Sequence, residues 1–160
     1  MRFLVITMLL IISGNVFASN TASKKAHKEL RCLALNIYFE ARGEPTSGQL
    51  AVAIVTMNRV HSKRYPGSIC SVVWQKHQFS WTHDGKSDRP TDKKAWKLAK
   101  KVANFVYYKY DSLKALSNGA IDLTKGALHY YAPKLADPYW AKNKQVTRRI
   151  GGHLFLANNS

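Results

Sequence analysis

Glutamate is scarce in this chain, which holds only Glu29, Glu40 and Glu44. Glu29 lies at the expected start of a helix, where the helix dipole favours a negative side chain. Glu40 follows the run I-Y-F in the expected last turn of the same helix, where a negative charge is unfavourable. Burial among aromatic side chains raises the pKa of a carboxyl group, because desolvation penalises the charged form. Glu40 is therefore a candidate general acid; the alternative is a surface acid paired with Arg42 or a lysine.

Glu44 follows Glu40 in the stretch Y-F-E-A-R-G-E. Gly43 suits the left-handed turn after a helix and Pro45 prevents the helix from continuing, so helical geometry does not fix where the two carboxyl groups lie. Two interpretations stay open at this point. Glu44 is either the second carboxylate of a catalytic pair or an anchor that accepts backbone N–H groups in the turn.

His129 and His153 suggest a metal site, and Cys32 and Cys70 suggest either a metal site or a disulfide. A catalytic zinc needs about three protein ligands, and the chain has no H-x-x-x-H or H-E-x-x-H spacing. The two cysteines do not form a C-x-x-C motif, which disfavours a structural metal. We therefore expect no metal and no cofactor. An even cysteine number in an exported chain is compatible with one disulfide, although sequence alone does not show that the two meet.

The first 18 residues have the pattern of a secretory signal. A charged start, M-R, precedes an apolar run over residues 3–12, and V-F-A provides small residues before a cleavage site after Ala18. An uncleaved membrane anchor is the alternative, but the run is well short of the ~20 residues that cross a bilayer. We expect a secreted or periplasmic protein without stable membrane insertion. Residues 19–28 then form a flexible basic leader, and residues 29–160 form one domain.

The charge is strongly positive, with 25 Lys and Arg against 9 Asp and Glu and a net charge of +16. Such an excess attracts polyanions to the surface. Nucleic acid is an unattractive partner for an exported protein, so we expect an anionic cell-wall surface instead. A basic surface that serves only solubility is the alternative.

The apolar periodicity predicts four helices followed by extended segments. The expected helices cover residues 28–41, 46–60 and 69–75, and the longest begins at Thr91-Asp92. Thr46 and Gln49 have the spacing of a capping box, and Ser68 is placed to cap the third helix. Residues 76–90 form a polar loop. Residues 127–131 and 146–156 are rich in aromatic and β-branched residues and favour short strands. The fold class is α+β, dominated by helices, with a small C-terminal sheet or hairpin.

The run from residue 32 to residue 60, C-L-A-L-N-I-Y-F-E-A-R-G-E-P-T-S-G-Q-L-A-V-A-I-V-T-M-N-R-V, closely resembles the opening of the SleB-like cell-wall hydrolases, the spore-cortex-lytic enzyme family. Further segments resemble the family in the same order: Y-P at 65–66, Q-F-S-W at 78–81, A-L-H-Y-Y at 127–131, D-P-Y-W-A at 137–141 and I-G-G-H-L-F at 150–155. The resemblance covers nearly all of residues 29–160.

The resemblance implies a compact lysozyme-like domain that cuts the glycan strands of peptidoglycan between N-acetylmuramic acid (MurNAc) and N-acetylglucosamine (GlcNAc). Members are similar to lytic transglycosylases, which use a single glutamate, and Glu40 matches it. Glu40 would protonate the leaving glycosidic oxygen and then take the proton of the muramic 6-hydroxyl, whose oxygen closes a 1,6-anhydro ring. Whether water attacks instead stays open. On this interpretation Glu44 is a turn anchor.

The other matched positions divide into two groups. We expect sugar contacts, with simple core packing as the alternative for each aromatic, at Gln78, Phe79, Ser80, Trp81, His129, Tyr130 and Tyr131. We expect a structural or supporting role for Glu44, Asn58 and His153, and a disulfide position for Cys32 and Cys70. Two other functions remain as alternatives: a zinc-dependent N-acetylmuramoyl-L-alanine amidase, and a non-catalytic basic cell-wall-binding protein.

Overall fold

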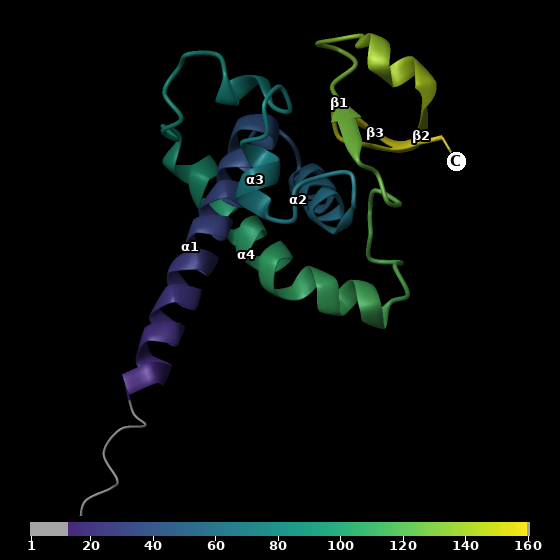
Figure 1. The fold of residues 1–160 in the computed structure, drawn as a ribbon. Coiled ribbons are helices and arrows are strands. Elements are labelled where there is room, and N and C mark those ends of the chain that lie inside the picture. Colours follow the sequence, from purple (N-terminus) through teal and green to yellow (C-terminus); the bar gives the residue numbers. More distant parts are fainter. Residues whose placement is uncertain (1–12, 160) are drawn as a thin grey trace, which may run out of the picture.

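The computed structural model describes residues 13–159, and the start of the predicted signal, residues 1–12, lies outside the described residues. Four α-helices are followed by a small sheet (Figure 1). The helices are α1 (Ser13–Ala41), α2 (Thr46–His61), α3 (Ile69–Val73) and α4 (Lys93–Leu116), with a short 3₁₀ helix η1 (Ser80–Thr82) before α4. The strands are β1 (His129–Tyr131), β2 (Lys144–Ile150) and β3 (His153–Asn158), with a second 3₁₀ helix η2 (Tyr139–Asn143) before β2. The helix-dominated α+β class predicted from the sequence is confirmed.

Helix α1 is longer than the sequence pattern predicts. It contains 29 residues and includes residues 19–28, where we expected a flexible leader. No proline interrupts this stretch, and its alanines, lysines and glutamate favour a helix, so the exposed turns continue into the buried ones. Because α1 starts at Ser13, Glu29 is not at a helix start. Its carboxylate instead accepts a hydrogen bond from the backbone N–H of Cys70 at the beginning of α3, 3.1 Å away.

The starts of the other helices follow from local capping. Asp92 caps α4 by accepting the N–H groups of Lys94 and Ala95, and Ser68 caps α3 as predicted. The predicted capping box of α2 is wrong. Pro45 already has the φ of −59° that a helix start requires, and no side chain caps it. Gln49 uses its amide to donate to the backbone oxygen of Glu44.

The sheet is antiparallel with the order β1-β3-β2, and it lies beside α2 (Figure 1). One hydrophobic cluster joins α1, α2, α3 and α4, and a smaller one joins α2 to the sheet through Val52, Val55 and Phe155. Tyr130 on β1 packs against both clusters. A disulfide between Cys32 and Cys70 ties α1 to α3. This packing fixes the end of α1, the end of α2 and β1 against one another.

Between residues 13 and 159, no helix combines the length and the apolar composition that crossing a membrane requires.

Candidate active site

Glu40 lies in the last turn of α1 with its carboxyl group largely buried, as the sequence predicts. The hydroxyl of Tyr130 donates to Oε2 at 3.2 Å. Burial raises the pKa of Glu40 to about 7, against the opposing effects of this hydrogen bond and of the positive charge of Arg59. A carboxyl group with such a pKa holds a proton in a large fraction of molecules at neutral pH, which suits a general acid.

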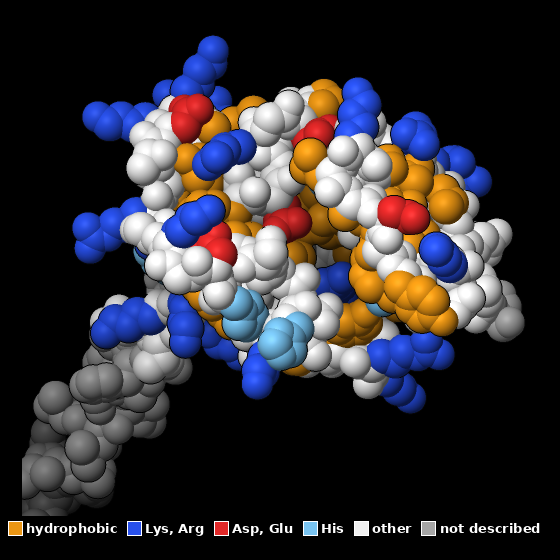
Figure 2. Space-filling model, turned by 90° about the horizontal axis from the view of Figure 1, so that it is seen from above, with side chains coloured by type: hydrophobic (Ala, Val, Ile, Leu, Met, Phe, Trp, Pro, Cys, Tyr) orange, Lys and Arg blue, Asp and Glu red, His pale blue; other side chains and the backbone are white. Residues whose placement is uncertain are grey.

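Glu40 lines a pocket of about 340 Å³ between the helical part and the sheet. Figure 2 shows a hollow on this face, with hydrophobic side chains on its walls and with Lys and Arg side chains, interspersed with a few acids, over the surrounding surface. The pocket is built from the ends of α1 and α2, the loop before η1, β1, η2 and the start of β2. Its lining residues are Glu40, Arg59, Tyr65, His77, Gln78, Phe79, His129, Tyr130, Trp140 and Lys144.

Arg59 is one of two charged lining residues, with Lys144, that our sequence analysis did not select. It lies near the end of α2 and only 5% of its surface is exposed. Its Nε donates to the backbone oxygen of Leu128 at 2.7 Å. The guanidinium carbon lies 5.2 Å from the ring centre of Tyr65 and 5.3 Å from that of Phe79. The available signal was its place in the N-R-V motif, directly after a buried helical stripe.

His129 lies on the pocket wall, where its ring is 5.6 Å from the ring of Trp140. Burial lowers the pKa of His129 to about 4, and the nearby charges of Lys144 and Arg59 act in the same direction. The imidazole is therefore neutral at physiological pH. Lys144 donates from Nζ to the side-chain oxygen of Asn158 at 2.8 Å.

Three residues that we expected to contact sugar do not line this pocket: Ser80, Trp81 and Tyr131. The indole of Trp81 is buried and stacks on Phe39, with ring centres 4.7 Å apart. Trp81 instead lines a second pocket of about 350 Å³, together with residues of the loop 84–91. The ring of Tyr131 lies against Trp140 at 5.9 Å. His129 and Tyr131 both contact Trp140, because alternate residues of β1 face the same side.

Glu44 does not line the Glu40 pocket but holds the turn between β2 and β3. Its Oε2 accepts the backbone N–H of Gly152 at 2.8 Å, and its Oε1 lies 3.7 Å from Nδ1 of His153. A Cβ atom on Gly151, whose φ is +57°, would overlap the Glu44 carboxylate. The pair of glycines therefore allows the close approach of the carboxylate to the turn. This geometry fits the anchoring role.

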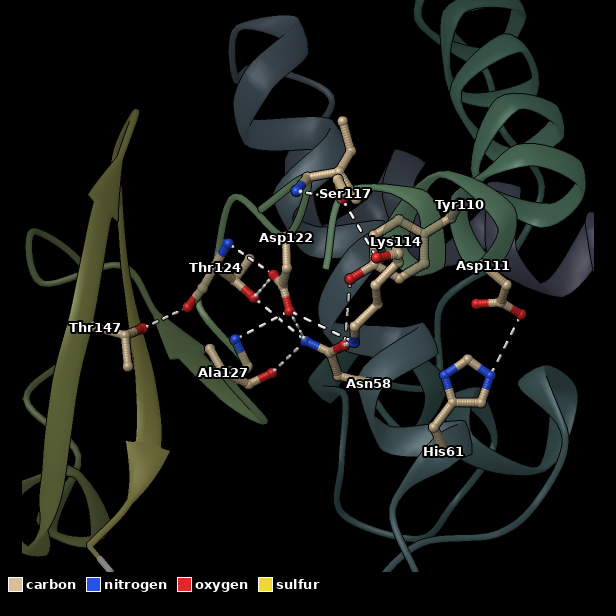
Figure 3. Close-up of polar contacts among 12 residues, drawn as sticks. Asn58, His61, Tyr110, Asp111, Lys114, Ser117, Asp122, Thr124, Ala127 and Thr147 are labelled. Atoms are coloured by element: carbon tan, nitrogen blue, oxygen red, sulfur yellow. Dashed lines mark hydrogen bonds and ion pairs between the residues drawn. The ribbon is translucent and has the colours of Figure 1, made fainter. Parts of the chain in front are cut away.

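Asn58 precedes Arg59 and lies in a buried polar network (Figure 3). Its Nδ2 donates to Asp122 at 3.0 Å, to Thr124 at 3.3 Å and to the backbone oxygen of Ala127 at 3.2 Å. Its Oδ1 accepts from Nζ of Lys114 at 3.0 Å. The network joins α2 and α4 to the segment that leads into β1, and Asn58 does not line the pocket.

Asp122 is the acid of this network. Its two oxygens accept the N–H and hydroxyl of Thr124 and the N–H of Gly126, and Nζ of Lys114 lies 3.8 Å away. Burial alone raises the pKa of Asp122, but the hydrogen bonds from Thr124, Asn58 and Gly126 together hold it below its usual value. The hydroxyl of Thr147 extends the network to β2 by donating to the backbone oxygen of Thr124 at 2.7 Å.

Among residues 13–159, no three His, Cys, Asp or Glu side chains are grouped so that they could hold a metal ion. His129 faces the Glu40 pocket, whereas His153 lies beside Glu44. The described residues therefore contain no set of side chains that could bind the zinc ion of an amidase.

Comparison with known proteins identifies the family. The family profile described as Cell Wall Hydrolase matches residues 43–156. The chain belongs to the cell wall hydrolase family. The profile match begins three residues after Glu40, so it covers α2, the loop and most of the sheet but not Glu40 itself.

Those relatives are spore cortex-lytic enzymes. The one from Bacillus subtilis (strain 168) is 29% identical over 138 residues, which is 86% of this chain and 40% of that protein. The one from Halalkalibacterium halodurans is 31% identical over 138 residues, 86% of this chain and 37% of that protein. The chain thus spans about two fifths of the length of these curated relatives.

Two solved structures are similar to the fold. The catalytic domain of the Bacillus cereus SleB protein has a TM-score of 0.61 and 28% identity, covering 82% of this chain and 91% of that one. The catalytic domain of the germination-specific lytic transglycosylase SleB from Bacillus anthracis has a TM-score of 0.60 and 30% identity, covering 81% and 93%. The predicted family is confirmed, and the likeness extends over almost the whole of two catalytic domains.

Proposed function

We propose that this chain is an exported enzyme that cleaves the MurNAc–GlcNAc bond of peptidoglycan and that Glu40 is its catalytic acid and base. The observation that carries the proposal is a largely buried glutamate with a pKa of about 7 in an aromatic-walled pocket. The likeness to the catalytic domain of a lytic transglycosylase supports the choice of bond.

The proposed reaction uses one carboxyl group twice. Protonated Glu40 gives its proton to the glycosidic oxygen as the bond from that oxygen to the anomeric carbon of MurNAc breaks. The resulting carboxylate takes the proton of the muramic 6-hydroxyl, while that oxygen bonds to the anomeric carbon and closes the 1,6-anhydro ring. Glu40 ends protonated, so the cycle balances without water.

The pocket lining favours this route over a two-carboxylate mechanism. A retaining glycosidase with a carboxylate nucleophile needs a second carboxyl group about 5–5.5 Å from the acid. Among the described residues that line the pocket, Glu40 is the one acid. Glu44, the nearest acid along the chain after Glu40, is bound to the turn at Gly152. The attacking oxygen is therefore proposed to come from the substrate itself.

Export is part of the proposal. The signal-like pattern of residues 1–18 supports it, as does the Cys32–Cys70 disulfide, since disulfides persist in oxidising compartments. The net charge of +16 and the many Lys and Arg side chains on the face in Figure 2 support attraction to an anionic cell-wall surface. Such binding weakens steeply as salt rises, because the charges are exposed and screened.

The test is digestion of purified sacculi followed by mass analysis of the soluble fragments, with the Glu40→Gln variant as the control without an acid proton. We expect fragments ending in 1,6-anhydro-MurNAc from the parent protein and none from the variant. Reducing MurNAc ends would show that water attacks, and free stem peptides would show an amidase. Binding to sacculi without any new fragment would show the non-catalytic wall-binding protein and overturn the proposal.

A further inference from the structure

Arg59 has a donor that the fold does not use. Its Nη1 is buried and has no hydrogen-bond partner among the described residues. Buried donors in folded proteins are nearly always paired, so an unpaired one next to a pocket requires an explanation. Leaving it unpaired is costly, because the group has lost water and gained no acceptor.

The structural contacts of Arg59 do not account for this donor. Nε already binds the backbone oxygen of Leu128, and the guanidinium already lies against the rings of Tyr65 and Phe79. These three contacts hold the planar group in place, and Arg59 lines the same pocket as Glu40. A planar group held in this way matches the oxygens of a carboxylate or carbonyl group better than a flexible ammonium does.

The charges around the pocket indicate which ligand atom fits. Arg59 and Lys144 contribute two cations, and His129 is neutral near pH 7. Glu40, on the end of α1, is the one acid of the lining and is partly protonated at that pH. Tyr130 from β1 and Tyr65 contribute neutral phenols. The pocket lining therefore carries excess positive charge and favours an oxygen acceptor with negative charge or a strong dipole.

We propose that Arg59 is a substrate-binding residue whose free Nη1 donates a hydrogen bond to an acyl oxygen on the muramic acid at the scissile bond. The inference rests on the proposed function. Muramic acid offers this chemistry twice, in the carbonyl oxygen of its 2-acetamido group and in the carboxyl or amide oxygen of its 3-O-lactyl group. Lys144 also lines the pocket, and its positive charge adds attraction for a lactyl carboxylate.

The experiment measures binding rather than turnover, in the Glu40→Gln background, with a peptide-free tetrasaccharide of alternating GlcNAc and MurNAc as the probe. Adding Arg59→Met should weaken binding about 10- to 100-fold, which is the usual effect of losing a hydrogen bond from a charged donor. Adding Arg59→Lys should also weaken it, because an ammonium cannot reproduce the planar fork. Arg64→Met, at an exposed arginine outside the pocket, is the matched control and should leave binding unchanged.

Two modified probes distinguish the two oxygens without any change to Arg59, so they remain informative if an Arg59 variant fails to fold. One tetrasaccharide is de-N-acetylated, and the other carries GlcNAc in place of each MurNAc and therefore lacks the lactyl group. The probe that lacks the bound oxygen should bind the Glu40→Gln protein about 10-fold or more weakly, and the Arg59→Lys substitution should then cause little further loss.

The outcomes separate the inference from the proposed function. If the Glu40→Gln protein does not bind the unmodified tetrasaccharide, the glycan is not the ligand and the proposed function fails. If that protein binds it, and folded Arg59→Met binds equally well, the role of Arg59 is structural and the inference is wrong. Equal binding of all three probes would contradict it in the same way.

Discussion

The surroundings of Asp122 and Glu40 shift the pKa values of these two acids in opposite directions. Asn58 interacts with Asp122 and Arg59 interacts with Glu40, and these two residues are adjacent on α2. Asp122 accepts several hydrogen bonds, including one from Asn58, and its pKa lies below the usual value. Among the residues that the structure describes, Tyr130 donates the one hydrogen bond to the Glu40 carboxyl group, and burial raises the pKa of Glu40 to about 7. Asn58 uses both ends of its amide within the fold, whereas Arg59 keeps one donor unpaired.

The difference indicates how the fold divides its polar groups between stability and chemistry. Around Asp122 each charge is compensated inside the protein, so the network stabilises the folded state and offers nothing to a ligand. Around Glu40, burial disfavours the charged carboxylate, and the Arg59 guanidinium has an unpaired donor. Such groups destabilise the free protein, and a bound ligand can supply the missing hydrogen-bond partner. Removing the charge of each acid in turn tests this division.

Glu40→Gln should have the largest effect, a loss of activity without a loss of stability. The amide keeps the shape but has no acidic proton, so the rate of glycan release should fall by about 100- to 10,000-fold. The free energy of unfolding should not decrease, because the substitution removes a buried carboxyl group that resists ionisation. Sacculus digestion measures the activity and urea denaturation measures the stability.

Glu44→Gln is the matched control. It should keep activity within a few-fold, since the Glu44 carboxylate binds the Gly152 turn. A folded but inactive Glu44→Gln protein would restore the two-carboxylate mechanism.

Asp122→Asn should show the reverse pattern. The amide cannot accept the same set of hydrogen bonds, and it leaves the ammonium of Lys114 beside a neutral group. We expect a loss of about 3 kcal/mol in the free energy of unfolding, with little change in activity per folded molecule. Urea denaturation monitored by tryptophan fluorescence measures the stability. Asp137→Asn, at an exposed aspartate, is the control and should be neutral. A stable but inactive Asp122→Asn protein would show that the network belongs to the active site.

The sequence was sufficient to predict Glu40 as a site residue but not to predict the network around Asp122. Glu40 could be predicted because a helix end, aromatic neighbours and the family motif all point to this one position. Asp122 could not, because its donors come from α2 and from a loop more than sixty residues later, and no local pattern joins them. Arg59 was missed for a similar reason: its partners Tyr65, Phe79 and Leu128 meet it only in the folded chain.

The helix limits show the same restriction. Apolar periodicity located the buried turns of α1, but it contains no information on the exposed turns that the helix continues into. Helix propensity and the lack of proline carried that information, and they extend the helix to Ser13. The start of α4 could be predicted from the sequence, because its cap, Asp92, binds backbone N–H groups only two and three residues later.

The dependence of stability on pH should differ in sign for the two acids. The pKa of Glu40 is about 7 in the folded protein and near its ordinary value of 4.5 in the unfolded chain. Its contribution to stability is therefore full below the lower value and lost as pH rises to about 7. Asp122 has a lowered pKa, so its contribution is lost as pH falls through that value. Glu40→Gln should therefore gain on the order of 2–3 kcal/mol over the parent above pH 7, relative to their difference in acid. Urea denaturation at several pH values measures this, and parallel pH curves for the parent and Glu40→Gln would contradict it.

Tyr130→Phe should have the smallest effect and the most specific one. The hydroxyl of Tyr130 donates to Glu40 and thereby favours the ionised carboxyl group, so its removal should raise the pKa of Glu40. An acid catalyst must be protonated to act, and activity should therefore persist to higher pH in the variant than in the parent. The rate of glycan release across pH measures the alkaline limb. Tyr131→Phe, on the same strand but outside the pocket lining, should leave that limb in place. If both variants keep the parent profile, Tyr130 packs beside Glu40 without setting its proton affinity, and the contrast with the Asp122 network would then lie in burial alone.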